Sequence, residues 1–163
     1  KRWLRGLIEE SQAGLANNRT RYVWEFAQNY WKDPSAYLRK ENELWTAYRD
    51  RLQGATLGLG HAKTAFAIEL LYFEAAQVVC IDTHQLQLYG LSGSQSPGLR
   101  TMNHIETHWV CECLRLGLPP CNARWALWDR KQGRDNSRYW SYVLEPENKT
   151  PVARQLKLFE LVA

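Results

Sequence analysis

The residues best suited to chemistry lie in two short stretches of the chain. The first reads Gly58-Leu59-Gly60-His61-Ala62-Lys63-Thr64-Ala65 and the second Cys80-Ile81-Asp82-Thr83-His84. Two glycines on either side of a leucine allow a tight turn that brings several backbone N–H groups to one surface. A helix that begins directly after such a turn offers its N-terminus to an anion such as a phosphate. The second stretch adds a single carboxylate at a fixed distance, which indicates a binding turn paired with an acidic group.

The elements that must position these stretches are predicted to be helices. Apolar spacing predicts helices over 3–16, 21–31, 35–52, 62–73 and 103–116, with a stop at Asp33-Pro34 and a further helix starting near Thr83. Residues 53–60 are expected to form a turn, 77–81 a short apolar approach to Asp82, and 90–98 a loop. A tryptophan-rich segment and the stretch 139–144 follow. Little of the chain alternates with a period of two, so the predicted class is all-α.

Composition places the chain among folded domains. Its 163 residues are 45% apolar and include eight Trp and eight Tyr, enough for one domain with a sizeable core. The net charge of +4 is compatible with nucleic acid without being diagnostic. The sequence contains no apolar run of about 18 residues, so no membrane partner is expected. Four cysteines in an otherwise ordinary composition do not indicate a disulfide scaffold. We therefore expect reduced thiols in a cytoplasm or nucleoid. The protein is also expected to be a monomer.

The two stretches together resemble the helix-hairpin-helix-Gly/Pro-Asp superfamily of DNA base-excision glycosylases, in its endonuclease III branch. Members usually show Leu-Pro-Gly-hydrophobic-Gly-x-Lys-Thr-Ala and, about a helix later, Val-Asp-Thr-His. The resemblance covers 54–134, because 103–118 and 122–128 look like the next two helices of the family, and it is weaker over 1–53. It implies a single helix-hairpin-helix glycosylase-like domain over 1–163: N-terminal helices in 1–53, the hairpin and catalytic helices in 54–134, and a C-terminal segment in 135–163.

The chain departs from the family pattern in three ways. In members with lyase activity the nucleophilic lysine lies two positions past the second glycine, where this chain has Ala62. Lys63 lies one position further on, yet 19 residues before Asp82, close to the family spacing; one residue along a helix rotates a side chain by about 100°. The four-cysteine spacing of the family's iron–sulfur cluster is missing. Only 57 residues precede Gly58, and the chain begins at Lys1 without Met, so the N-terminal part is expected to be minimal or shortened.

The resemblance implies cleavage of a base–sugar bond in DNA, with Asp82 as the catalytic carboxylate. A sheltered carboxylate would stabilise the positive charge that develops on the sugar, or activate water or a lysine. The alternative is that Asp82 only caps the next helix, which is compatible with catalysis. Thr83 and His84 are expected to support Asp82, with His84 packing or hydrogen bonding behind it. Lys63 is either a Schiff-base nucleophile that would add strand-nicking lyase activity or a phosphate clamp.

The hairpin is expected to grip one DNA strand without regard to sequence. The residues predicted to do so are Gly58, Leu59, Gly60, His61, Ala62, Lys63 and Thr64, the last two also through their side chains. The family's hairpin often holds a monovalent cation through its carbonyls; no other cofactor is implied. The alternatives are a plain turn between helices and, for the whole chain, a non-catalytic DNA-binding module.

Three further sets of residues each have a functional and a structural interpretation. His104, His108 and Cys111 share one helix face and, with Cys121, could form a zinc site, although surface histidine pairs on helices are common. A base turned out of the duplex needs an aromatic partner, for which Trp125, Trp128 and Tyr30 are candidates. Basic clusters are more often solvated faces than binding sites; they comprise Arg19 with Arg21, Arg39 with Lys40, Arg49 with Arg51, and Arg130 with Lys131 and Arg134.

Overall fold

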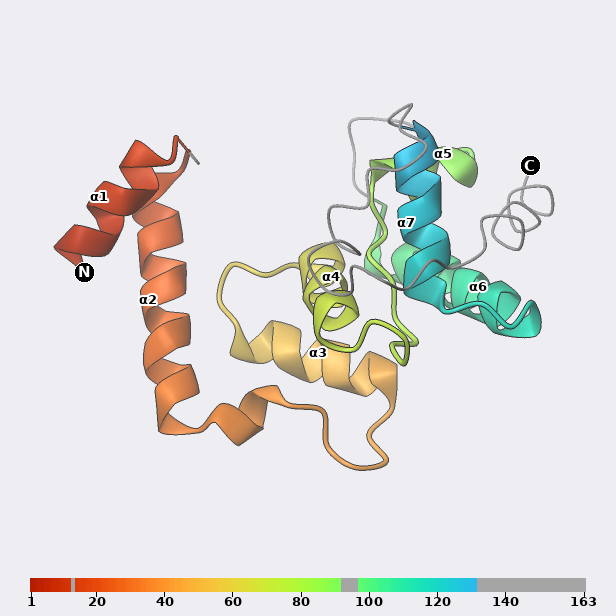
Figure 1. Cartoon of the computed structure of the whole chain (residues 1–163), viewed down its shortest axis with the longest axis horizontal. Coiled ribbons are helices and arrows are strands. Elements are labelled where there is room, and N and C mark those ends of the chain that lie inside the picture. The colour runs from red at the N-terminus through yellow and green to blue at the C-terminus, as the bar shows by residue number, and fades with distance from the viewer. Residues whose placement is uncertain (13, 92–96, 132–163) are drawn as a thin grey trace, which may run out of the picture. The chain divides into compact units, whose positions relative to one another are not determined.

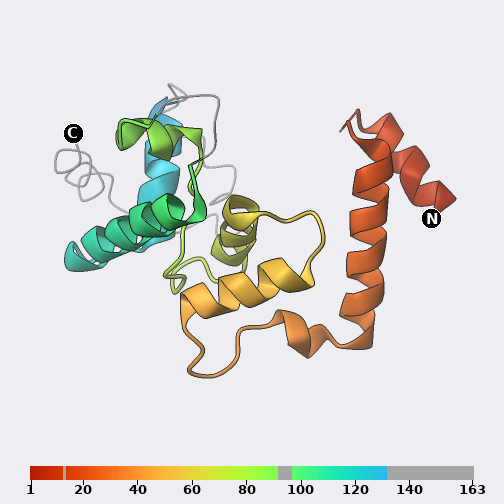
Figure 2. The same cartoon turned by 180° about the vertical axis from the view of Figure 1, so that it is seen from behind.

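The computed structural model describes residues 1–12, 14–91 and 97–131. Over these residues the chain forms seven α-helices and one 3₁₀ helix, and no strand (Figures 1 and 2). The all-α class predicted from the sequence is therefore confirmed for this part of the chain. None of the helices in these ranges is long and apolar enough to span a membrane. The chain divides into two compact units, Lys1–Thr64 and Ala65–Ala163.

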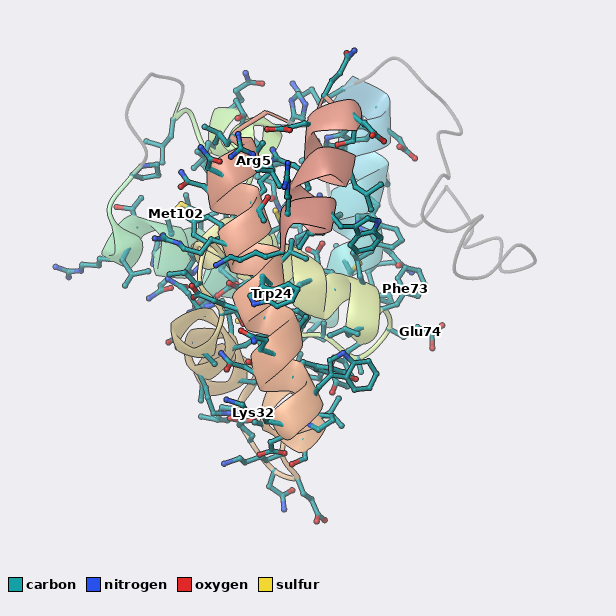
Figure 3. All side chains as sticks on the ribbon, turned by 90° about the vertical axis from the view of Figure 1, so that its left-hand side faces the viewer. Arg5, Trp24, Lys32, Phe73, Glu74 and Met102 are labelled. Atoms are coloured by element: carbon teal, nitrogen blue, oxygen red, sulfur yellow. The ribbon has the colours of Figure 1, made fainter. Side chains whose placement is uncertain are left out.

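The first unit begins with two helices that pack against each other, α1 (Arg2–Glu10) and α2 (Ala16–Lys32). The helix predicted over 3–16 was too long, because left-handed backbone at Gln12, Gly14 and Leu15 (φ 54°, 66° and 47°) ends it. The second helix accordingly starts five residues earlier than predicted. Trp24 lies midway along α2 and Lys32 at its end (Figure 3).

The predicted helix over 35–52 is wrong in its first half. A short 3₁₀ helix, η1 (Pro34–Tyr37), comes first, and α3 (Trp45–Ala55) begins only after a loop. Asn42 has a left-handed φ of 59° in that loop, which no continuous helix accommodates. Arg51 of α3 holds the loop by donating to the Leu38 carbonyl at 2.8 Å and to both carboxylate oxygens of Glu43 at 2.8 Å. This bonding across the loop outweighs the local helical pattern.

The second unit contains most of α4 (His61–Leu71), together with α5 (Thr83–Leu88), α6 (Leu99–Arg115) and α7 (Pro120–Lys131). Helices α5 and α6 each pack against α7. The Trp109 indole N–H of α6 donates to the Pro120 carbonyl at 3.1 Å, which ties the start of α7 to α6. One core cluster joins these helices to the segment before α5; its buried members are Val79, Ile81, Ile105, Trp109, Cys113, Leu118, Ala123 and Leu127. The predicted helix start near Thr83 is confirmed, and α6 starts four residues before the predicted position.

Candidate functional site

The glycine hairpin is a tight turn that leads directly into α4. The Leu59 N–H donates to the Thr56 carbonyl at 3.3 Å, and Gly58 between them has a φ of 87°. A β-carbon on Gly58 would lie 2.2 Å from Cδ2 of Tyr22, closer than any real contact. Gly58 is therefore required both by its backbone conformation and by the approach of a ring. Gly60 differs, since a β-carbon there would meet open space.

The hairpin side chains differ in what they can offer a ligand. Lys63 is exposed in the first turn of α4, whereas Thr64 is fully buried. The Thr64 hydroxyl and backbone N–H both bond the Gly60 carbonyl, at 3.0 and 2.9 Å. Thr64 therefore fixes the turn, and Lys63 presents an amine to solvent. Helix geometry directs the backbone N–H groups of the first turn out of its N-terminal end, where an anion can accept them.

In the second unit, an extended segment held by two buried carboxylates delivers Asp82. Val79 donates its backbone N–H to Glu106 at 3.0 Å, and Cys80 donates its own to Glu69 at 2.9 Å. Both glutamates are buried. The segment thus obtains its backbone partners from side chains instead of from a neighbouring strand. This anchoring fixes where the chain emerges at Asp82.

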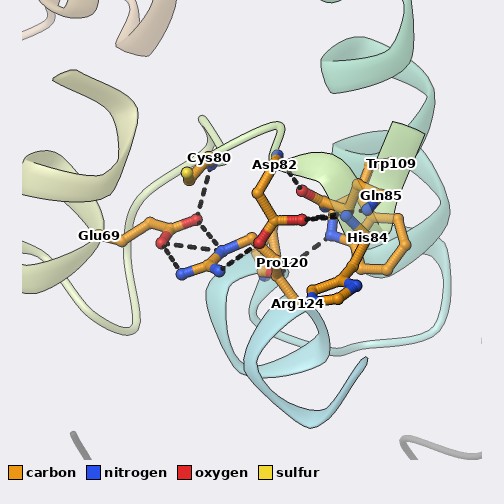
Figure 4. Close-up of polar contacts among 8 residues, drawn as sticks. All are labelled: Glu69, Cys80, Asp82, His84, Gln85, Trp109, Pro120 and Arg124. Carbon is orange, nitrogen blue, oxygen red and sulfur yellow. Dashed lines mark hydrogen bonds and ion pairs between the residues drawn. The ribbon is translucent and has the colours of Figure 1, made fainter. Parts of the chain in front are cut away.

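The Asp82 carboxylate caps α5 with one of its oxygens. Oδ1 accepts the backbone N–H groups of His84 and Gln85 at 2.9 and 3.1 Å, and the Gln85 side chain accepts the Asp82 N–H in return, at 3.4 Å (Figure 4). This is a capping box, so the N-cap reading of Asp82 is confirmed. The Asp82 side chain is 25% exposed. The carboxylate is therefore fixed in direction and only partly shielded from solvent.

The second oxygen of Asp82 faces a buried ion pair. Oδ2 lies 3.5 Å from a terminal nitrogen of Arg124, whose other nitrogens bind Glu69 at distances of 2.5 to 3.0 Å (Figure 4). Arg124 also lies over the Phe66 ring, 5.4 Å from its centroid. Burial disfavours the charged guanidinium, but the carboxylate of Glu69 outweighs it and raises the pKa of Arg124. Arg124 is therefore a permanent cation beside Asp82.

The remaining groups near Asp82 are less suited to reaction. Burial is the largest of the effects that raise the pKa of the Cys80 thiol to about 12, so this thiol is protonated at neutral pH. Thr83 is exposed, and the backbone of His84 contributes to the cap as described above. Asp82 thus contributes a partly exposed carboxylate to this segment.

The residues considered as a zinc site are not arranged as one. Cys121 is buried, whereas His104 and Cys111 are exposed, and His108 bonds the Tyr89 hydroxyl through Nδ1 at 2.7 Å. The described residues contain no group of three His, Cys, Asp or Glu side chains arranged for a metal ion. All four cysteines are free thiols.

The aromatic stacking candidates occupy different environments. The Trp125 ring lies 4.8 Å from that of Phe73, Trp128 is 37% exposed, and Tyr30 packs against both Phe26 and Tyr37. Partial exposure leaves Trp128 the most accessible ring of the three candidates in α2 and α7.

The basic clusters are not uniformly solvated. Arg49 is only 1% exposed, although its cluster was expected to be a solvated face or a binding site, and Arg51 is engaged in the loop before α3. Arg134, with the stretch 139–144, lies outside the described residues.

Sequence reasoning did not identify Glu69, Glu106 or Arg124. Glu69 carried a signal, because it is the single charged residue in the apolar run 65–71. An isolated charge in a buried helix needs a partner, but the partner, Arg124, is 55 residues away in the chain. Comparisons with models of protein families, with curated proteins and with solved structures found no match to this chain.

Proposed function

We propose that this protein is a DNA base-excision N-glycosylase that cleaves the base–sugar bond of a modified nucleotide turned out of the duplex. The observation that carries the proposal is the Asp82 carboxylate. It emerges from a buried segment, its direction is fixed by two backbone N–H groups, and its side chain is 25% exposed. A carboxylate held in this way is preorganised to stabilise positive charge on a deoxyribose.

The hairpin supports DNA as the substrate. Gly58 and Gly60 shape a turn at the N-terminus of α4, and the exposed Lys63 adds a cation there. Backbone N–H groups and an amine are suitable partners for the phosphates of one strand. The exposure of Lys63 favours a phosphate clamp over a Schiff-base nucleophile, because such a nucleophile is activated by burial or a neighbouring cation.

The test uses duplexes that carry uracil, oxidised pyrimidines, 8-oxoguanine or alkylated bases. We expect excision of at least one of these bases by the wild type and a loss of about 10² or more in rate for Asp82→Asn. Asparagine retains an oxygen that caps the helix, so Asp82→Asn should keep the wild-type stability. Asp82→Ala should lose the rate and, in addition, about 1 kcal/mol of stability from the missing cap.

These variants separate the two roles of Asp82. Excision at an undiminished rate by Asp82→Asn would exclude Asp82 as the catalytic carboxylate. Salt-dependent DNA binding without excision of any base in the panel would instead support the alternative, a non-catalytic DNA-binding module.

A further inference from the structure

Glu69, Arg124 and Asp82 form a chain of alternating charges within the second unit. The side chains of Glu69 and Arg124 are 0% and 5% exposed, and that of Asp82 is 25% exposed. The hydrogen bonds to the two oxygens of Glu69 all come from N–H donors, which requires an ionised carboxylate. Two carboxylates and one guanidinium leave a net charge of −1, and the only partly exposed member is Asp82.

We propose that Glu69 is a positioning residue for the reaction: by neutralising Arg124, it keeps the negative charge of Asp82 available to the sugar. This inference rests on the proposed glycosylase function. Glu69 is fully buried and anchors the backbone of Cys80. It reaches the charge of Asp82 through Arg124, which contacts both carboxylates. Without Glu69, Asp82 would be the remaining counter-charge of the guanidinium, 3.5 Å away, and its own negative charge would be neutralised.

The geometry of the guanidinium indicates that Arg124 is neutralised mainly by Glu69 and not by Asp82. Its Nε and one terminal nitrogen are directed at Glu69 at 2.5 to 3.0 Å, a forked arrangement that Arg and carboxylates prefer. The contact to Asp82 is longer and comes from the other terminal nitrogen. Arg124 is therefore bonded first to Glu69 and is only a neighbour of Asp82.

The experiment compares two abasic-site analogues in otherwise identical duplexes. One carries a pyrrolidine, which is a cation at neutral pH, and the other a neutral tetrahydrofuran. The ratio of the two dissociation constants measures how strongly the site favours positive charge on the sugar. We would measure it for the wild type, Glu69→Gln, Arg124→Met, the double variant and Asp82→Asn. Glu112→Gln is the matched control, because Glu112 pairs with Arg115 on the exposed surface of α6.

We expect the wild type to prefer the cationic analogue and Glu69→Gln to lose about 10-fold or more of that preference, as when a preorganised electrostatic partner is removed. The double variant removes both compensating charges and should recover the preference. Arg124→Met should also keep it, because burial raises the pKa of Glu69 and favours its protonation once the guanidinium is gone. Glu112→Gln should match the wild type.

Two results would overturn the inference while leaving the proposed function intact. One is a folded Glu69→Gln protein with the wild-type preference, and the other is a double variant that remains as low as Glu69→Gln, which would indicate a purely structural role. If Glu69→Gln does not fold, the double variant decides: a retained preference supports the inference and a lost one overturns it. A wild type that does not distinguish the analogues would instead reject the proposed function, and this inference with it.

Discussion

Breaking the Glu69–Arg124 pair should destabilise the second unit far more than removing both of its charges. Glu69→Gln leaves a guanidinium whose side chain is 5% exposed without its main counter-charge. Uncompensated buried charges of this kind typically cost 3–5 kcal/mol. Asp82 at 3.5 Å offers partial compensation, so we expect a loss of about 3 kcal/mol in the free energy of unfolding.

The double variant Glu69→Gln/Arg124→Met tests the physical reasoning. Replacing both members of a buried ion pair by well-packed hydrophobic residues of similar volume is often neutral or stabilising. Arg124→Met follows this rule, and Glu69→Gln keeps an oxygen that can accept the Cys80 N–H. The double variant should therefore lie within about 1 kcal/mol of the wild type, which implies a coupling energy of at least about 2 kcal/mol. The exposed pair Glu112–Arg115 is the matched control, and its removal should change stability by about 1 kcal/mol or less.

Urea unfolding followed by far-UV circular dichroism measures the total effect. Because the chain has two compact units, a local probe is also needed. The Cys80 amide provides it, since it donates to Glu69 and its hydrogen exchange should accelerate in Glu69→Gln. A cost below about 1 kcal/mol for this variant, or a double variant as unstable as the sum of the single ones, would refute the assignment of a strongly coupled buried pair.

Three further predictions concern the first unit. Gly58→Ala should lower stability by about 2–4 kcal/mol in thermal or urea unfolding, because the cost of a left-handed backbone and the cost of a clash with the Tyr22 ring add together. Gly60→Ala should fold normally and only weaken DNA binding. Equal stability of the two variants would contradict this reasoning. The hydrogen bond to Arg51 lowers the pKa of Glu43 from 4.5 to about 2, so the stabilisation from this ion pair is present above about pH 4.5 and is lost as the pH falls toward 2. The difference in unfolding free energy between the wild type and Glu43→Gln should shrink over that range. A difference that stays constant with pH would exclude this contribution of Glu43. Borohydride should trap no adduct that depends on Lys63 if this lysine is a phosphate clamp, while Lys63→Ala should weaken DNA binding and reduce its salt dependence by roughly one phosphate contact.

Local signals in the sequence were sufficient for the cap of α5. Asp82, Thr83 and Gln85 lie within one helical turn, and the side-chain hydrogen bonds of the cap all connect residues at most three apart. The apolar stretch that contains the buried residues Val79 and Ile81 could likewise be predicted from the sequence. These features depend on neighbours in the chain, so periodicity and residue type predict them.

The loop before α3 and the buried ion pair depend on partners distant in the sequence. Arg51 reaches back 13 residues to the Leu38 carbonyl, and Arg124 reaches Glu69 across 55 residues. Neither contact leaves a local pattern: both arginines read as ordinary basic residues of helices, and 38–44 reads as helical. The sequence therefore predicts which segment delivers the acid, but not what holds that segment or sets its charge.

The double use of Asp82 follows from the geometry of a carboxylate. Capping occupies Oδ1, which accepts two backbone N–H groups, and leaves Oδ2 outside the cap. Oδ2 has an arginine as its neighbour, and that arginine is already bonded to Glu69. The cap thus fixes the orientation of the carboxylate, whereas the ion pair determines how much of its charge remains available. The catalytic role proposed for the Asp82 carboxylate is therefore compatible with its role as a helix cap, provided that a second carboxylate, here Glu69, balances the nearby guanidinium.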